Sequence, residues 1–527
     1  MNHDPFVCEV RCPVHGFISL TDLEREIVNH PAFQRLRRIK QLAWTDYVYP
    51  GASHSRFEHS LGVMHLASRL YEAVVRASED TLREVFNYTD AGLSRDWQIV
   101  RLAGLLHDVG HGPFSHATES LLPFKAHENL SLFPNPEQPS KQYRHEDYSV
   151  AIIESLLGEL IEQHPVNRRN YKITAEEITA LISKGSPGGA SLFWKDLISG
   201  QLDADRMDYL LRDSLHAGVS YGRFDLDRIV SSVCVIRRPS EESAEPKIAV
   251  MRGGFHAAEA LIVARYWMHK QVYFHKTRLV CDHHLEKAMT AILRNEQNSA
   301  TGAPYFPRPD SKDQLEKFLA WDDYRAMGLL AAGKGSEHGD RLMNRNHYRL
   351  VCELEVSDSN LSELSASMKR NDEIVAMLGP LVKFHTQPTA SWYKAKAASD
   401  ELVLVDDAGK EQIGFLSRYS ALMKSINLGS IRFVYADRAD ADEARRQYRD
   451  HLKRESLAAG LSQELPIVQA STAGTPDIQA EVEEAAPLAG SFESPTESVQ
   501  LTLGPPRPEV KSVQSGLIAK KGVQDAV

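Results

Sequence analysis

Residues 102–116 read LAGLLHDVGHGPFSH, and this stretch does most to decide the fold class and the site. The apolar residues before His107 predict the last turns of a buried helix. Glycines and a proline follow at once, so the helix ends just beyond His107 and Asp108. A neighbouring imidazole and carboxylate are costly to bury without a partner, and a metal ion is the most economical partner. A His–Asp hydrogen bond without an ion is the alternative.

Two other segments offer ligands for the same ion. His59 lies on the apolar stripe of a helix predicted from Glu58 to about Ala77, where a lone histidine is usually an ordinary core residue. Asp205 lies on the polar face of a helix within residues 196–213, a pattern that a solvated face also explains. His59, His107, Asp108 and Asp205 together suit manganese, iron or zinc, with open positions for water and a phosphate oxygen. Water bound to such an ion loses a proton near neutral pH and can attack phosphorus esters.

Further polar residues surround these four in the sequence. Histidines with a pKa near 6.5 can act as general acids or bases, and cationic side chains can neutralise phosphate oxygens. The histidines are His111, His116 and His145, and the cations are Arg56, Arg206, Arg265 and Lys276. Arg265, His269, Tyr273 and Lys276 form one stripe of a helix predicted from Phe255 to about Asn295, which is either exposed surface or a phosphate clamp.

Composition limits the classes of protein. The 527 residues carry a net charge of −10, which leaves nucleic-acid binding possible but not expected. Five scattered cysteines predict no disulfide framework, and no apolar run reaches the length of a membrane span. We therefore expect a cytoplasmic protein without a membrane partner.

The order of elements predicts a mainly α fold. A short strand pair is expected within residues 1–20, and helices over residues 20–42, with Pro31 opening the second of them. The basic residues 35–40 of that second helix form either a solvated face or an anion site. One short helix is expected over 315–330.

Three regions are expected along the chain. Residues 1–330 form the core and 331–460 a smaller α+β lobe, with strands at 347–355, 401–406 and 431–435. Residues 461–527, rich in Pro, Ser, Gly and Glu, form a disordered tail.

Three motifs resemble one family. Residues 49–63 (YPGASHSRFEHSLGV), 107–116 (HDVGHGPFSH) and 205–213 (DRMDYLLRD) resemble the HD-domain phosphohydrolase superfamily. Within it they resemble the deoxynucleoside triphosphate triphosphohydrolases (dGTPase-like), most of all the catalytic core of the sterile-alpha-motif and HD-domain dNTPase. The resemblance implies an all-helical HD-domain core that hydrolyses dNTPs, with dGTP favoured, to a deoxynucleoside and tripolyphosphate.

It also implies roles for individual residues. His59, His107, Asp108 and Asp205 match metal ligands, His145 matches the general acid, and His111 and His116 match histidines near the α-phosphate. The matching substrate positions are Arg56, Lys276 and Arg206 for the triphosphate, Tyr209, Asp213 and Tyr273 for the sugar, and Gln41 and Leu42 elsewhere in the pocket. Arg206 stands where that relative has lysine. Mg²⁺ is expected with the substrate triphosphate, and a homo-oligomer is expected.

A nucleotide effector site is a further implication. Gln34 and Arg37 are kept, but Asn29 replaces the acidic residue that reads guanine in that relative. An amide cannot supply a charged bidentate acceptor, so the resemblance extends to an anionic effector near Arg37 rather than to guanine-specific activation.

Two other functions fit the same residues. An HD-type nucleotidase or cyclic-nucleotide phosphodiesterase would keep the metal centre and release other products. A metal-stabilised regulatory or nucleic-acid-binding scaffold would use the basic residues 35–40, but it has no need of His145, Tyr209, Asp213 and Tyr273.

Overall fold

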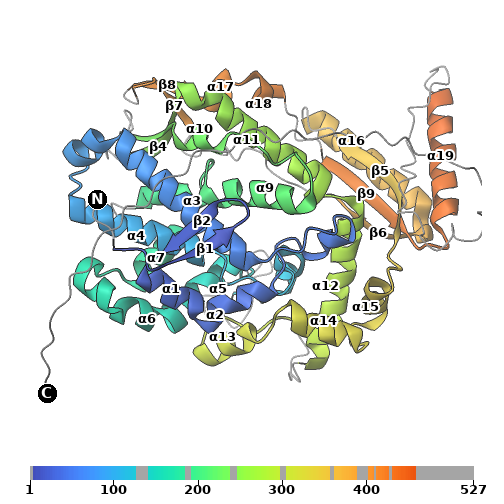
Figure 1. Cartoon of the computed structure of the whole chain (residues 1–527). Coiled ribbons are helices and arrows are strands. Elements are labelled where there is room, and N and C mark those ends of the chain that lie inside the picture. Colours follow the sequence, from blue (N-terminus) through green and yellow to red (C-terminus); the bar gives the residue numbers. More distant parts are fainter. Residues whose placement is uncertain are drawn as a thin grey trace, which may run out of the picture. The chain divides into compact units, whose positions relative to one another are not determined.

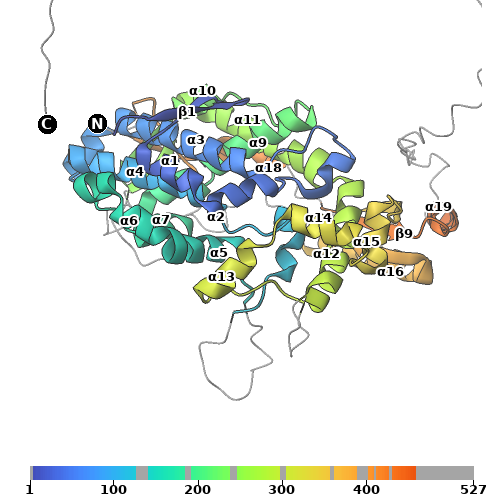
Figure 2. The same ribbon diagram turned by 60° about the horizontal axis from the view of Figure 1, so that its bottom comes forward.

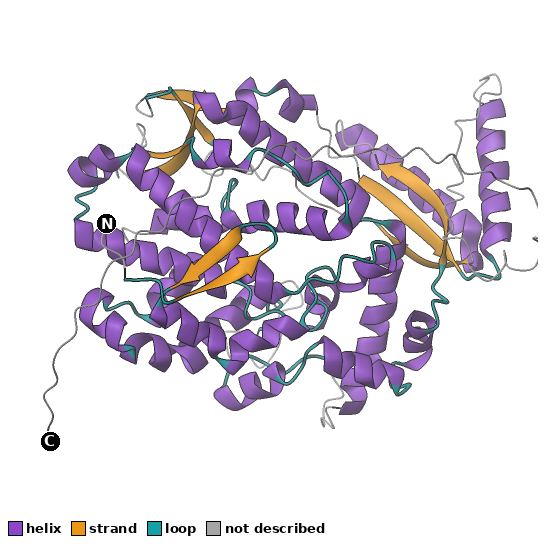
Figure 3. Cartoon of the chain, in the orientation of Figure 1, coloured by secondary structure: helices purple, strands orange, loops and turns teal. Residues whose placement is uncertain are grey.

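The structure is a computed structural model of the chain. It describes residues 4–125, 141–183, 192–237, 246–296, 304–356, 361–388, 401–408, 411–425 and 430–458. The predicted tail over 461–527 lies outside the described residues. Helices dominate the described part, and the strands are gathered in three small sheets (Figure 3).

Two long helices that pack on each other form the centre of the core: α3 (Arg56–Ala77) and α4 (Asp90–Leu106). Most side chains of both helices are buried, which is why their hydrophobic pattern is broad rather than one-sided. Against them pack α9 (Ala204–Ala217) and the strand pair β1 (Cys8–Cys12) and β2 (Gly16–Leu20). The predicted strand pair and the mainly α fold are confirmed.

The other core helices surround this centre (Figure 1). Gly62 allows α9 to approach α3, because a Cβ there would overlap the side chains of Asp208 and Arg212. The helices are α1 (Asp22–Asn29), α2 (Pro31–Gln34), α5 (His145–Ile152), α6 (Gly158–Gln163), α7 (Ala175–Ile182), α8 (Asp196–Ser199), α10 (Leu226–Val230), α11 (Phe255–Met268) and α12 (Lys276–Glu296).

One sheet has the order β3-β4-β7-β8 and contains strands that are far apart in sequence. Its strands are β3 (Val233–Arg237), β4 (Pro246–Met251), β7 (Val403–Val405) and β8 (Gln412–Phe415). β7 pairs in parallel with β4, so the described residues 401–408 and 411–415, with the following α17 (Leu416–Tyr419) and α18 (Ala421–Ser425), lie against the core.

A second sheet has the order β5-β9-β6. It contains β5 (Arg349–Val356), β6 (Val382–Thr386) and β9 (Ser430–Ala436), with α16 (Leu361–Leu378) and α19 (Ala441–Ala458) packed on it. Before it come α13 (Lys312–Leu319), α14 (Asp323–Ala331) and α15 (Ser336–Met343). α12, α14 and α15 contact one another and lie side by side in both views (Figures 1 and 2). The domain limits at residues 330 and 460 stay predictions.

Several predicted elements were wrong in detail. The helix expected up to Leu42 ends in a 3₁₀ turn at Arg35–Arg38, because the Arg56 amide pairs with the Ile39 carbonyl and the Gln41 amide with that of His54. The basic residues 35–40 therefore do not form a helical face. The strand near 401–406 joins the sheet of β4 and not that of β5 and β9.

Two predicted helices are interrupted. The helix expected over 255–295 is broken by a π turn at His269–Tyr273, which places the Tyr273 hydroxyl 2.7 Å from Asp213. The single helix expected over 315–330 is two helices, because Asp322 caps a new helix by accepting the Arg325 amide.

Candidate active site

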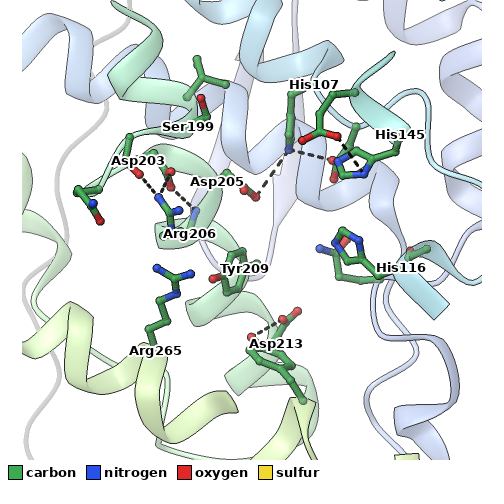
Figure 4. A pocket seen from close by; sticks show the side chains of 18 of the residues that line it. His107, His116, His145, Ser199, Asp203, Asp205, Arg206, Tyr209, Asp213 and Arg265 are labelled. Carbon is green, nitrogen blue, oxygen red and sulfur yellow. Dashed lines mark hydrogen bonds and ion pairs between the residues drawn. The ribbon is translucent and has the colours of Figure 1, made fainter. Parts of the chain in front are cut away.

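The four predicted metal ligands come together from three helices. His59 is on α3, His107 and Asp108 follow the last residue of α4, and Asp205 is in the first turn of α9. His59 Nε2 lies 3.1 Å from Asp205 Oδ1 and 3.4 Å from Asp108 Oδ2. His107 Nε2 lies 3.4 Å from Asp108 Oδ1 and 3.7 Å from Asp205 Oδ1 (Figure 4).

In both His59 and His107, a hydrogen bond at Nδ1 fixes the ring and leaves Nε2 directed toward the cluster. His59 Nδ1 donates to Asp208 Oδ2 at 2.8 Å, and His107 Nδ1 donates to the Gly104 carbonyl at 2.8 Å. Carboxylates and carbonyls only accept, so both Nε2 atoms carry lone pairs in the neutral rings. Neither Nε2 has a hydrogen-bond partner among the described residues, although both are buried.

The donor set fits a divalent transition metal. Ligands at about 2.0–2.2 Å from one ion lie roughly 3–3.5 Å from each other, which is close to the separations observed. Despite burial, the charge of Arg56 holds the pKa of Asp108 well below its usual range, and the adjacent imidazoles of His107 and His59 lower that of Asp205. Both carboxylates are therefore ionised, as metal ligands must be.

His15 and Asp208 form an outer layer that the sequence did not assign to the site. His15, just before β2, hydrogen-bonds Asp208 Oδ1 at 2.6 Å, and Arg212 donates to the same carboxylate at 2.8 Å. Asp208 in turn holds His59. Asp208 and Arg212 lie on the same helix as Asp205, and the side chains of both are fully buried.

The loop after the metal ligands brings the predicted general acid close. A Cβ at Gly110 would overlap the His145 carbonyl and the Ser149 amide, so glycine lets the start of α5 approach the loop. The Ser149 hydroxyl accepts from the Gly110 amide and donates to the His107 carbonyl. The ring of His111 stacks on that of His145 with centroids 3.9 Å apart.

Glu119 is a site residue that the sequence analysis missed. Its Oε1 lies 2.7 Å from His145 Nδ1, and its Oε2 lies 2.9 Å from His116 Nδ1. Burial opposes protonation of His145, but this hydrogen bond and the charges of Glu146 and Glu119 outweigh it and raise its pKa. The spacing in the sequence could have indicated Glu119, because an acidic residue three positions after His116 lies on the same face of a helical turn.

The backbone is strained at the end of the loop that follows Asp108. Phe114 and Ser115 have positive φ values of 58° and 56°. The Phe114 amide donates to Asp323 Oδ1 at 2.7 Å, and the Ser115 hydroxyl donates to the Lys40 carbonyl and accepts from Arg56 Nε. The loop is thus fixed by α14, which lies far along the chain.

A cavity of about 1140 Å³ opens onto the metal ligands and contains most predicted substrate residues. Figure 4 shows Arg206 and Arg265 pointing into one side of it, with His116 and His145 on the other and Tyr209 and Asp213 nearby. The predicted residues that line it are Gln41, Leu42, Arg56, His107, Asp108, His116, His145, Asp205, Arg206, Tyr209, Asp213, Arg265, His269 and Tyr273.

Some predicted residues lie elsewhere. His59 and His111 are buried beneath the lining. Lys276 is not part of the described cavity wall, while Arg278 two residues further on is. Burial lowers the pKa of His269 to about 3, so this residue is neutral and adds no positive charge.

The predicted effector residues form a separate surface group. Gln34 accepts from Arg37 Nε at 2.9 Å and donates to the Val28 carbonyl, and the Arg37 guanidinium lies 3.5 Å from the centre of the Phe57 ring. Asn29 is exposed at the end of α1.

Known proteins resemble this chain in both sequence and structure. The HD domain family matches residues 56–213, and the HD associated region matches residues 224–379. The uncharacterised protein YwfO of Bacillus subtilis is 34% identical over 350 residues, covering 64% of this chain and 70% of that protein. A hypothetical protein of Aquifex aeolicus, known from a crystal structure, aligns with a TM-score of 0.61 and 26% identity over 84% of this chain and 99% of its own.

The human deoxynucleoside triphosphate triphosphohydrolase SAMHD1 is 32% identical over 334 residues, covering 59% of this chain and 49% of that enzyme. The match to an uncharacterised protein of Methanocaldococcus jannaschii covers 50% of that protein. The chain therefore spans about half the length of these two curated relatives.

The fold and the His–Asp cluster define a protein of the metal-binding HD-domain phosphohydrolase class. Within that class the chain belongs to the HD-domain dNTPase family, together with the SAMHD1 proteins. Among the described helices, none combines the length and apolar composition that a bilayer-spanning segment needs.

Proposed function

We propose that this protein hydrolyses deoxynucleoside triphosphates, dGTP first among them, to a deoxynucleoside and tripolyphosphate. One observation carries the proposal: three of the four predicted metal ligands line the same cavity as two arginines and two aromatic residues. These residues are His107, Asp108 and Asp205, the arginines Arg206 and Arg265, and the tyrosines Tyr209 and Tyr273. A cluster that binds a metal next to cations suits a phosphate chain. The tyrosines suit a sugar.

The cofactor is a divalent transition ion, manganese, iron or zinc, held by His59, His107, Asp108 and Asp205, and Mg²⁺ accompanies the triphosphate. When bound, the ion supplies Lewis-acid activation of water next to the α-phosphorus. The reaction adds the water oxygen to that phosphorus and breaks its bond to the 5′ oxygen.

His145 protonates the departing 5′ oxygen. Its Nδ1 is held by Glu119, so Nε2 is the atom available to a substrate in the cavity that His145 lines. Its raised pKa favours the protonated imidazole, the form that a general acid requires. His111 stacks against the ring and holds its plane.

The sugar is held by Asp213, Tyr273 and Tyr209. Asp213 accepts from the Tyr273 hydroxyl at 2.7 Å and from His54 Nε2 at 2.7 Å, which fixes the carboxylate. The rings of Tyr209 and Tyr273 are 6.0 Å apart. An aromatic ring near C2′ would exclude a ribose hydroxyl.

The proposal also covers the cellular compartment, the oligomeric state and a nucleotide effector. All five cysteines are free, which fits a reducing compartment such as the cytoplasm. The proposal extends to a homo-oligomer and to an anionic nucleotide effector near Gln34 and Arg37, neither of which is required by the chemistry at the cavity.

The test is hydrolysis of each dNTP with several divalent metals, with and without GTP, followed by identification of products. Tripolyphosphate supports the proposal, whereas inorganic phosphate from a deoxynucleoside monophosphate supports a nucleotidase. His107→Ala and Asp205→Ala should abolish turnover and metal content together. His145→Ala should lower kcat by roughly a hundredfold with metal retained. Full activity of a folded, metal-free His107→Ala protein would refute the mechanism.

A further inference from the structure

A second group of histidines lies outside the catalytic cavity. His283 and His284 are on α12 and His338 is on α15. Each offers a ring nitrogen, and these three nitrogens all lie within 4.8 Å of one another. His284 is fully buried and the other two are partly exposed, so solvent reaches the group from one side.

The arrangement of the rings matches that of a metal site. Their centroids are 5.6 Å apart for His283 and His284, 5.6 Å for His283 and His338, and 5.1 Å for His284 and His338. Three imidazoles bound through nitrogens at about 2.0–2.1 Å from a tetrahedral ion have ring centres roughly 5 Å apart. The centroids of His59 and His107 at the catalytic centre are 5.3 Å apart.

The charge state of the rings also suits metal binding. Burial, together with the neighbouring histidines, lowers the pKa of His283 to about 4 and that of His284 to about 3, and burial lowers that of His338. All three rings are therefore neutral at pH 7, which is the form that binds metal ions. Neutral nitrogen donors suit zinc better than magnesium or calcium.

A hydrogen bond between His284 and His338 accounts for the closeness of two of the three histidines, but not for that of His283. His284 Nε2 accepts the Tyr348 amide at 3.3 Å, so its proton is on Nδ1 and is donated to His338 Nδ1 at 2.8 Å. His283 takes no part in that bond. Its ring is instead held against Phe384, with centroids 3.9 Å apart and planes 19° from parallel.

We propose that His283, His284 and His338 form a zinc site, with water as the fourth ligand, that ties α12 to α15. Zinc replaces the proton between the two Nδ1 atoms. That proton moves to His284 Nε2, so the ring of His284 stays neutral. The 3.3 Å hydrogen bond from the Tyr348 amide to Nε2 is then broken. The partly exposed His338 turns to widen the distance between the two Nδ1 atoms.

The experiment measures zinc bound to the full chain without a histidine tag, by equilibrium dialysis and metal analysis. Asp205→Ala serves as the background, because it removes a catalytic ligand. In that background, His283→Gln and His338→Gln should each remove one further equivalent of zinc or weaken its binding roughly a hundredfold or more. His256→Gln is the matched control, since the His256 side chain is 91% exposed and bonds only Glu259 among the described residues.

Folding is checked in the same proteins. Both test positions are partly exposed, so the variants should fold like the parent by circular dichroism. Zinc should raise the Tm of the Asp205→Ala protein but not that of its His338→Gln or His283→Gln derivative. Equal zinc binding in the Asp205→Ala protein and both derivatives, or none in any of them, would overturn the proposal. Neither result bears on dNTP hydrolysis.

Discussion

Glu119→Gln tests the assignment of the general acid. The Glu119 carboxylate stabilises the protonated form of His145 through a 2.7 Å hydrogen bond. Glutamine keeps the shape and removes the charge, so the pKa of His145 should fall. A general acid acts in its protonated form, so if His145 has that role the alkaline limb of the pH profile should move to lower pH.

The size of the shift follows from the contact. A hydrogen bond to a charged group contributes about 1.5–3 kcal/mol, and one pKa unit corresponds to about 1.4 kcal/mol. The limb should therefore move down by about 1–2 units. Above the pKa of both proteins the activity should be about 10–100-fold lower, whereas at acidic pH the two should be nearly equal.

The assay is kcat against pH for dGTP hydrolysis by the parent, Glu119→Gln and Glu146→Gln. Glu146 lies 3.6 Å from His145 Nδ1, beyond hydrogen-bond distance, so its variant should shift the limb less. A substrate with a nitrophenolate leaving group needs no proton, and Glu119→Gln should hydrolyse it as the parent does. Coincident alkaline limbs for the parent and Glu119→Gln would refute the role given to His145.

Three other outcomes are expected. His15→Ala removes a hydrogen bond to Asp208 and should weaken metal binding about 10–100-fold, measured by chelator competition; unchanged affinity would contradict the orienting role. Glu24→Gln leaves Arg101 buried without its charged partner and should cost about 3–5 kcal/mol of stability, measured by urea unfolding; a midpoint equal to that of the parent would argue against this ion pair. A chain cut after residue 460 should keep its kcat, and loss of activity would show that the tail takes part.

The sequence predicted what depends on local pattern and motif. The glycines after His107 and the apolar stripe that contains His59 predicted helices, and His107, Asp108, His59 and Asp205 taken together predicted a metal centre. The comparisons confirmed the family, and the structure brings those ligands to one point. The role of each residue stays a prediction.

What the sequence did not show depends on long-range contacts. His15 reaches Asp208 across 193 positions of the chain, and Glu119 takes its role only when α5 packs on the loop. The π turn that contains Tyr273 was not predicted from periodicity, and the contact it allows is with Asp213 of α9, 60 positions away. Such contacts cannot be read from periodicity within one segment.

The anchoring of Phe114 by Asp323 has a consequence for biosynthesis. The predicted metal ligands leave the ribosome early, on or next to helices that pack on each other. The residue that fixes the strained loop beside them, and the residues 401–402 that close the cavity, emerge much later. A nascent chain can thus contain all four predicted ligands before the wall of the cavity is complete, so we expect the proposed activity only after most of the protein has been made.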